Sequence, residues 1–415
     1  MRFDDVSSAR IGRREFMVLG AGAMFGSLAP AKGGRAAPKP GSAPMPQDGT
    51  TVTLFLCGDV MTGRGIDQIL PHPVDPHICE PFVQSALTYV ELAEEANGPV
   101  RRPVGFSYIW GDALAELERA APDARIINLE TSVTARGDCT GRGISYRMNP
   151  ANLPCLTSAG IDCCVLANNH VFDWGRQGFL DTLESLEGAG LKIAGAGRGR
   201  GQAAAPAILD LPGRGRVLVF SIGVASSGIP RGWAASAGRP GVNFLPELSG
   251  EALAGIAAQV RRHKQTGDIA VASIHWGGNW GYEVPPEQRR FAHGLIDESG
   301  IDIVHGHSSH HVKGIEVYNG KLIFYGCGDF LNDYEGISGY ERFRDDLVLM
   351  YFPSVSASGE LIQCRMVPLR IRNLRLNRTS REEAEWLAQT LAREGRSLGT
   401  AVHSGTNGDL FLDWS

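Results

Sequence analysis

Several apolar segments of this 415-residue chain end in polar side chains, and this placement constrains the fold most strongly. Segments of β-like composition alternate with segments whose apolar residues recur at helical spacing, which predicts an α/β fold. Five predicted strands end at such polar groups: Thr51–Cys57 before Asp59, Arg125–Leu129 before Glu130, Ile161–Leu166 before Asn169 and His170, Asp268–Ile274 before His275, and Ile301–Val304 before a histidine cluster. Ligands of open α/β sheets lie outside the carboxyl ends of the strands, so we expect these polar groups to meet in one pocket.

The histidine cluster is the strongest single signal for a metal ion. Four of the eleven histidines lie between residues 305 and 311, and one turn seldom needs four imidazoles for packing. Imidazole nitrogens together with carboxylate and amide oxygens form ligand sets that suit Mn, Fe or Zn. The predicted metal ligands are Asp59, Glu130, Asn169, His275, His307 and His310. His305 and His311 are assigned supporting roles.

Each predicted ligand taken alone has an ordinary structural interpretation. An aspartate that follows a strand, such as Asp59, commonly forms a turn or caps a helix. Glu130 fits a hydrogen-bonded carboxylate of the core, and Asn169 fits a residue that supports a turn. The metal prediction therefore depends on the whole set of residues.

Two further residues near the predicted pocket have the chemistry of a proton-transfer pair. His170 is predicted to be the general acid that protonates a leaving oxygen, with Asp173 orienting its ring. If two metal ions bind, Glu130 is the carboxylate expected to bridge them.

The N-terminus has the pattern of an export signal. The pair Arg13-Arg14 precedes a short apolar stretch over residues 18–29, which small residues follow. This order predicts a twin-arginine signal peptide over residues 1–37 and a flexible linker over residues 38–50. The expected location is periplasmic or extracellular, with a membrane anchor if the signal stays uncleaved. A cytoplasmic protein with a chance Arg-Arg pair is the alternative.

The remainder of the chain is predicted to be globular. Its 43% hydrophobic and 20% charged residues are ordinary for a folded protein, and its net charge of −5 argues against a nucleic-acid partner. We expect one domain over residues 51–372, with a C-terminal helix and short strand over residues 373–415 packed on it. The helices are expected at residues 112–121, 176–188, 249–266, 286–299 and 381–393. Among the eight cysteines, two disulfide pairings stay open, Cys79–Cys139 and Cys139–Cys155.

Eight short motifs occur in order between residues 52 and 352. They are GDVMTGR at 58–64, NLE at 128–130, YRMNP at 146–150, ANNHVFD at 167–173, HWG at 275–277, PEQRRFAH at 286–293, GHSSH at 306–310 and IEVYNGKLIFY at 315–325. Together they resemble the CapA family of poly-γ-glutamate capsule biosynthesis proteins, and motifs in sequence are more specific than one motif. The resemblance implies a fold like that of the calcineurin-type metallophosphoesterases, a four-layer α-β-β-α sandwich of two mixed sheets.

The resemblance also implies roles for individual residues. The predicted metal ligands match the ligand positions of the metallophosphoesterases, and His170 matches their catalytic histidine. Arg64 and Arg147 lie in family motifs, where they would bind an anionic substrate. The chain departs from the phosphoesterase pattern at four places: Met61 replaces a ligand histidine, Glu130 the bridging aspartate and Asp329 an asparagine, and His307 and His310 lie three rather than two residues apart.

Four functions stay open at this point. The first is an exported CapA-type protein in the biosynthesis or processing of an anionic polymer such as poly-γ-glutamate. It would work with membrane-bound synthetase subunits, use a divalent ion (Mn, Zn, Fe, Mg or Ca) and have hydrolase-like chemistry. The second is a metal-dependent phosphoesterase, and the third is an epimerase-type enzyme that transfers protons on a peptide. The fourth is a binding module without catalysis.

Overall fold

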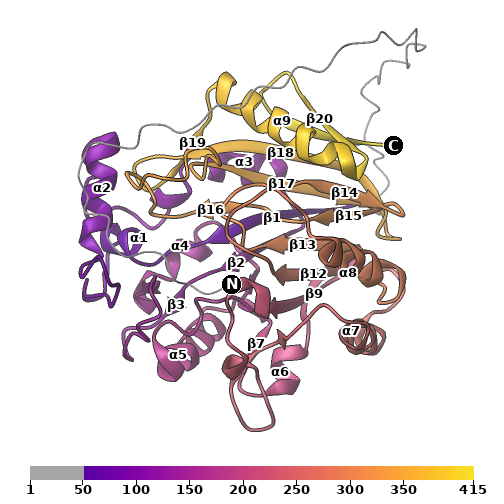
Figure 1. The fold of residues 1–415 in the computed structure, drawn as a ribbon, viewed down its shortest axis with the longest axis horizontal. Helices are drawn as coiled ribbons and strands as arrows, with labels where there is room; N and C mark the ends of the chain where they lie inside the picture. Colours follow the sequence, from indigo (N-terminus) through magenta and orange to yellow (C-terminus); the bar gives the residue numbers. More distant parts are fainter. Residues whose placement is uncertain (1–50) are drawn as a thin grey trace, which may run out of the picture. The chain divides into compact units, whose positions relative to one another are not determined.

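The computed structural model describes residues 51–415, so the predicted signal peptide and linker lie outside the described residues. Most described strands belong to two large mixed sheets (Figure 1). The ten-stranded sheet has the order β20 (Thr400–Ser404), β21 (Leu410–Trp414), β18 (Leu361–Ile371), β17 (Leu347–Val355), β1 (Val52–Val60), β2 (Ala124–Leu129), β5 (Cys163–Val165) and β6 (Lys192–Ala194), with β16 (Asp329–Leu331) on β1 and β19 (Leu376–Arg378) on β18.

The second large sheet has seven strands. Their order is β11 (Phe244–Leu245), β9 (Gly215–Val224), β12 (Ile269–His275), β13 (Ile303–His307), β15 (Lys321–Phe324) and β14 (Ile315–Tyr318), with β8 (Ala207–Leu211) also on β9. Two small ladders pair β3 (Ser132–Val133) with β4 (Arg147–Met148) and β7 (Ala196–Gly197) with β10 (Gly241–Val242). Parallel pairs such as β12 with β13 and antiparallel pairs such as β17 with β18 occur together, which confirms the mixed α/β class.

Helices connect and cover the strands. They are α1 (Gly65–Ile69), α2 (Leu87–Asn97), α3 (Ala113–Ala120), α4 (Pro154–Thr157), α5 (Gly175–Gly188), α6 (Arg200–Ala204), α7 (Gly250–His263), α8 (Pro286–Asp297) and α9 (Arg381–Gly395). The Ser249 side chain caps α7, and Ser380 and Glu383 form a capping box at α9, which satisfies amide groups of the first turns. Among the described helices, none is both long and apolar enough to cross a membrane.

Three large hydrophobic clusters and one small cluster around Tyr89 form the core of the described residues. One cluster combines residues of both large sheets, including Leu56 of β1 and Val271 of β12, so the two sheets share a common interior. The opposite faces pack on helices: Phe55 of β1 shares a cluster with residues of α5, and Ile274 of β12 shares one with residues of α7 and α8. Strands covered on both faces are apolar on both faces, which explains their continuous hydrophobic runs.

A bulge in β1 aims Asp59 toward the common interior of the two sheets. Strict alternation from Leu56 would place residue 59 on the opposite face. The pairing with β2 instead shifts by one residue, because Leu56 pairs with Ile126 whereas Asp59 pairs with Asn128. The extra residue at the bulge returns Asp59 to the face that Leu56 occupies.

Gly58 permits this bulge because the backbone of another segment lies directly against it. A Cβ atom on Gly58 would lie 1.6 Å from the carbonyl oxygen of Gly328. Asp59 N–H donates to that same oxygen at 3.0 Å, which joins β1 to the start of β16. The close approach brings Asp329 alongside Asp59.

Replacing Gly58 by alanine is expected to lower the free energy of unfolding by about 2 kcal/mol or more, since the new methyl group must push two backbones apart. Chemical denaturation of the full-length variant measures the loss. The matched control is Gly255→Ala in α7, where a Cβ meets no atom within 4 Å. That control should be neutral or stabilising, because alanine favours helix more than glycine does. Equal stability of the two variants would contradict the role of the close approach.

One disulfide is present among the described cysteines. It joins Cys79 to Cys139, whereas Cys155 is free and buried. Of the two pairings left open by the sequence, the structure therefore contains the first. The bridge fastens the segment before β4 to the loop that precedes α2.

Candidate metal centre

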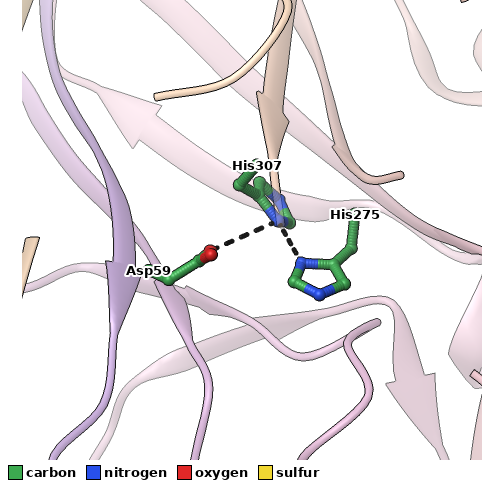
Figure 2. Close-up of side chains that lie close together, drawn as sticks. All are labelled: Asp59, His275 and His307. Carbon is green, nitrogen blue, oxygen red and sulfur yellow. Dashed lines mark hydrogen bonds and ion pairs between the residues drawn. The ribbon is translucent and has the colours of Figure 1, made fainter. Parts of the chain in front are cut away.

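The predicted ligands come together where strands of both large sheets end. Asp59 and Glu130 come from β1 and the end of β2, whereas His275 and His307 end β12 and β13. Figure 2 shows Asp59, His275 and His307 pointing toward one another. All of these side chains are almost fully buried. The structure thus gathers the predicted residues, and their role as ligands stays a prediction.

The histidine cluster divides between a strand and a turn. The strand expected to end at Val304 continues to His307, so His305 and His307 point to the same face of β13. Ser308 then adopts a φ of 100°, a region that residues other than glycine rarely occupy, and its N–H donates to Asp59 Oδ2 at 3.2 Å. This turn leads to His310, which joins Asp59 in a second group of potential ligand atoms.

Two groups of potential ligand atoms overlap at Asp59. Asp59, His275 and His307 form one group, and Asp59, His310 and Asp329 form the other, with the atoms of each group within 4.8 Å of one another. Asp59 is the shared carboxylate, and Glu130 belongs to neither group. Asp59 is therefore a second candidate for a bridging carboxylate, and the bridging role of Glu130 stays a prediction.

Asp329 was missing from the predicted ligands. Its Oδ1 lies 2.8 Å from His310 Nδ1, and its Oδ2 accepts from Asn332 Nδ2 at 2.8 Å. Although burial disfavours charge on His310, the Asp329 carboxylate raises the pKa of its ring. The sequence showed an aspartate between Gly328 and Phe330 but not that β16 lies beside β1.

A chain of hydrogen bonds places the ring proton of His307 on Nε2. His305 Nε2 lies 2.7 Å from the carbonyl oxygen of Cys57, so it carries the hydrogen. Burial lowers the pKa of His305 to about 4, so its other nitrogen, Nδ1, accepts the single hydroxyl hydrogen of Ser273 at 3.1 Å. Ser273 Oγ must then accept from His307 Nε2 at 2.9 Å. His307 Nδ1 is left with a free lone pair.

The second histidine is arranged in the same way. His275 Nε2 donates to Asn169 Oδ1 at 2.7 Å, and burial lowers the pKa of both His275 and His307 well below the ordinary value. His275 Nδ1 therefore also carries a lone pair, and it lies 2.7 Å from His307 Nδ1. Asp59 Oδ1 lies 3.7 Å from His307 Nδ1. Two lone pairs and a carboxylate that converge on one point are a donor set for a cation.

The carboxylates of the site show the same need for positive charge. Burial, followed by the charge of the neighbouring Asp329, raises the pKa of Asp59 to about 7. Burial, followed by the charge of Asp59, also raises the pKa of Glu130. Asn128 Nδ2 donates to Asp59 Oδ1 at 2.7 Å, but an amide does not neutralise these charges. The residues present therefore fit a divalent metal ion.

Replacing Ser273 by alanine is expected to weaken metal binding about tenfold or more, as loss of an outer hydrogen-bond partner commonly does. His307 would lose the acceptor that keeps its proton on Nε2. Competition between metal-depleted protein and a coloured chelator measures the affinity.

The control for this substitution is Ser221→Ala on the neighbouring strand. Ser221 lies directly opposite Ser273 in the pairing of β9 with β12, and its buried hydroxyl has no hydrogen-bond partner in the described part of the chain. Its loss should leave metal affinity unchanged. An equal effect of the two substitutions would show that packing, not the hydrogen-bond chain, explains the result.

The predicted proton-transfer pair lies at the edge of the site. His170 Nδ1 is 2.7 Å from Asp173 Oδ2, which also accepts from Tyr146 N–H at 2.8 Å. His170 Nε2 faces Glu130 Oε1 at 3.7 Å, and the side chain is 12% exposed. A carboxylate that holds one ring nitrogen leaves the other free to face a substrate. His170 is therefore placed to exchange a proton between the site and its surroundings.

The two arginines predicted to bind substrate differ in their partners. Arg64 is buried, pairs with Asp333 and Glu80, and stacks on Tyr89. Its charge is neutralised inside the protein, so this placement argues against a substrate-binding role. Arg147 stacks on Trp174 at 3.5 Å and donates to the carbonyl oxygen of Asp75 at 2.8 Å. It thus contacts the loop that follows α1, and its substrate-binding role stays a prediction.

Comparisons with known proteins show the family to which the chain is related. The family described as "Bacterial capsule synthesis protein PGA_cap" matches residues 53–334. A "Probable polyglutamine synthesis accessory protein" of Mycobacterium tuberculosis is 48% identical over 354 residues, 85% of this chain and 93% of that protein. The "PGA biosynthesis protein CapA" of Bacillus subtilis is 31% identical over 235 residues, 56% of this chain and 58% of that protein. The region matched by the family contains both groups of ligand atoms.

Proposed function

Because the chain belongs to the bacterial capsule synthesis protein family, we propose that it is an exported accessory protein in the synthesis of a polyglutamate-type polymer. It would process the polymer at a divalent metal centre and work beside the membrane-bound subunits that synthesise it. The proposal includes a four-layer α-β-β-α arrangement, which the shared core of the two sheets supports. The twin-arginine pattern at residues 13–14 supports export.

The convergence of Asp59, His275 and His307 carries the chemical part of the proposal. Three buried ligand atoms from two sheets have no evident structural purpose without a cation, since the two imidazole lone pairs repel each other at 2.7 Å. A divalent ion held there would supply Lewis-acid polarisation of a substrate carbonyl or phosphoryl oxygen. Its identity is open among Mn, Zn, Fe, Mg and Ca.

The chain's own residues supply the proton transfer. In hydrolysis of an amide link, water adds across the C–N bond and yields a carboxylic acid and an amine. His170 would deliver a proton from Nε2 to the departing nitrogen, and Asp173 would stabilise the charged ring through Nδ1. The low exposure of the site keeps most of the bulk water out.

A phosphoesterase is the second candidate function. The observation in its favour is that two ligand groups share Asp59. Two ions held there would stabilise the attacking and the leaving oxygen of a phosphoryl transfer. The same protein preparation can decide between the two substrates.

The test begins with full-length protein purified without a metal-affinity tag. Metal analysis should find at least one divalent ion per chain. Mass spectrometry should then show shortening of a γ-linked glutamate oligomer that stops after chelation and resumes with added metal. Faster hydrolysis of a generic phosphodiester would favour the second candidate. A protein that holds no metal and changes neither substrate would contradict both.

A further inference from the structure

Arg142 lies on a segment that is fastened beside the proton-transfer pair. Three residues before it, Cys139 is bonded to Cys79. Thr140 N–H donates to the carbonyl oxygen of Asp173 at 2.9 Å. Arg142 is therefore held near the carboxylate that orients His170, although the residue itself is exposed.

The guanidinium of Arg142 also reaches the loop that follows β9. Its Nη2 donates to the carbonyl oxygen of Gly228 at 2.7 Å. Two residues earlier in that loop, Ser226 Oγ accepts from Gly277 N–H at 3.0 Å, and Gly277 follows His275 by two residues. Arg142 thus spans the rim of the site, from the His170 side to the His275 side.

Unlike Arg64, Arg142 has no acidic partner. The described residues place no carboxylate within salt-bridge distance of it, and only one of its five N–H groups makes a hydrogen bond. Its guanidinium lies 4.5 Å from the centre of the Trp233 ring, and Trp233 packs on Phe172 at 4.9 Å. Burial against these neighbours lowers the pKa of Arg142, while the nearby charge of Asp173 opposes that effect. Contact with the Trp233 ring holds the guanidinium in place and leaves its remaining donors free.

We propose that Arg142, held over the Trp233 ring, binds a free α-carboxylate of a γ-linked glutamyl polymer and so positions a neighbouring link at the metal centre. The assignment rests on the proposed function and adds the group that selects an anionic polymer. A planar guanidinium with free N–H groups binds a carboxylate through two parallel hydrogen bonds, which an ammonium cannot match. Arg142 takes the role that was predicted for Arg64, whose charge is already paired with Asp333 and Glu80.

The experiment compares two oligomers on the full-length protein by calorimetry. One is γ-linked glutamate, whose α-carboxylates are free, and the other is γ-linked isoglutamine, in which those carboxylates are amides. Arg142→Ala is expected to weaken binding of the glutamate oligomer about tenfold and to leave binding of the isoglutamine oligomer unchanged. The affinity of Arg142→Lys for the glutamate oligomer should lie between those of the wild type and Arg142→Ala, since lysine retains the charge but lacks the planar pair of donors. Binding of the glutamate oligomer to the wild type should also weaken with added salt, and this dependence should shrink in Arg142→Ala.

Arg239→Ala is the matched control. Arg239 is likewise exposed and donates from Nη2 to one carbonyl oxygen, that of Ala234 at 3.1 Å, but it lies on a different loop. It should bind both oligomers like the wild type. Unchanged glutamate binding in Arg142→Ala, with weakened binding in Asp59→Asn, would overturn the role of Arg142 alone. Equal loss for both oligomers would overturn its selectivity, and a wild type that binds neither would overturn the proposed function as well.

Discussion

Replacing Asp59 by asparagine is expected to reduce metal affinity by more than about 100-fold. Loss of a residue that only hydrogen-bonds to a ligand commonly reduces it about 10–100-fold, and Asp59 is itself a predicted ligand. Asp59 is the one carboxylate shared by both ligand groups, so its loss weakens both at once. The substitution keeps the shape of the side chain and removes its charge. Metal analysis after dialysis, together with chelator competition, measures the result.

The same variant should change how stability depends on pH in metal-depleted protein. The pKa of Asp59 rises from 3.8 to about 7 on folding because the side chain is buried. The folded protein thus holds this proton more tightly than the unfolded chain. Asp59 favours the folded state below about pH 4, and this contribution is lost as the pH rises to about 7. Denaturation curves of Asp59→Asn should therefore fall less steeply over this range.

Added metal supplies the complementary measurement. An ion that binds only the folded protein raises its melting temperature, and this shift should be present in the wild type and absent in Asp59→Asn. Asp67→Asn is the control, because Asp67 is also buried but accepts from Val74 N–H at 2.8 Å and Asn149 N–H at 2.9 Å, outside the metal centre. That variant should be less stable yet keep the metal-induced shift. A full metal-induced shift in Asp59→Asn would contradict the assignment of the centre.

The sequence indicated much of this site because of where the polar residues stand. A strand covered on both faces reads as a continuous apolar run, so a charged or imidazole side chain at its end is conspicuous. His275 and His307 end β12 and β13, and these adjacent parallel strands pair His275 directly with His307. Residues at the same end of neighbouring strands must lie close together. Local pattern and general topology were enough to predict that they meet.

Features that depend on contacts between distant segments were not predictable in this way. The bulge that turns Asp59 inward requires the backbone of Gly328 against Gly58, and this same contact brings Asp329 into the centre. The environment of Arg64 was likewise not predictable. Its motif indicated a positive charge but not that Asp333 and Glu80 pair with it. Whether a charged residue is free or already paired depends on tertiary structure. That difference separates Arg64 from Arg142.

Replacing His170 by alanine is expected to slow processing of the glutamate oligomer about 10²–10⁴-fold, the usual contribution of a general acid. Metal content should not change, because His170 belongs to neither ligand group. The departing nitrogen would then have to leave without a proton from Nε2. Initial rates from mass spectrometry, measured on protein with verified metal content, give the effect.

Chemical rescue distinguishes proton transfer from a structural role of His170. Free imidazole should restore part of the rate to His170→Ala, since the side chain is 12% exposed and its removal leaves space at the edge of the site. The control is His403→Ala, which removes a histidine with the same kind of pairing, Nδ1 to Asp413 Oδ2 at 2.6 Å, on the exposed strand β20. That variant should keep the full rate and show no response to imidazole. If His170→Ala also kept the full rate, proton delivery would have to come from another group, and the pairing of His170 with Asp173 would be structural.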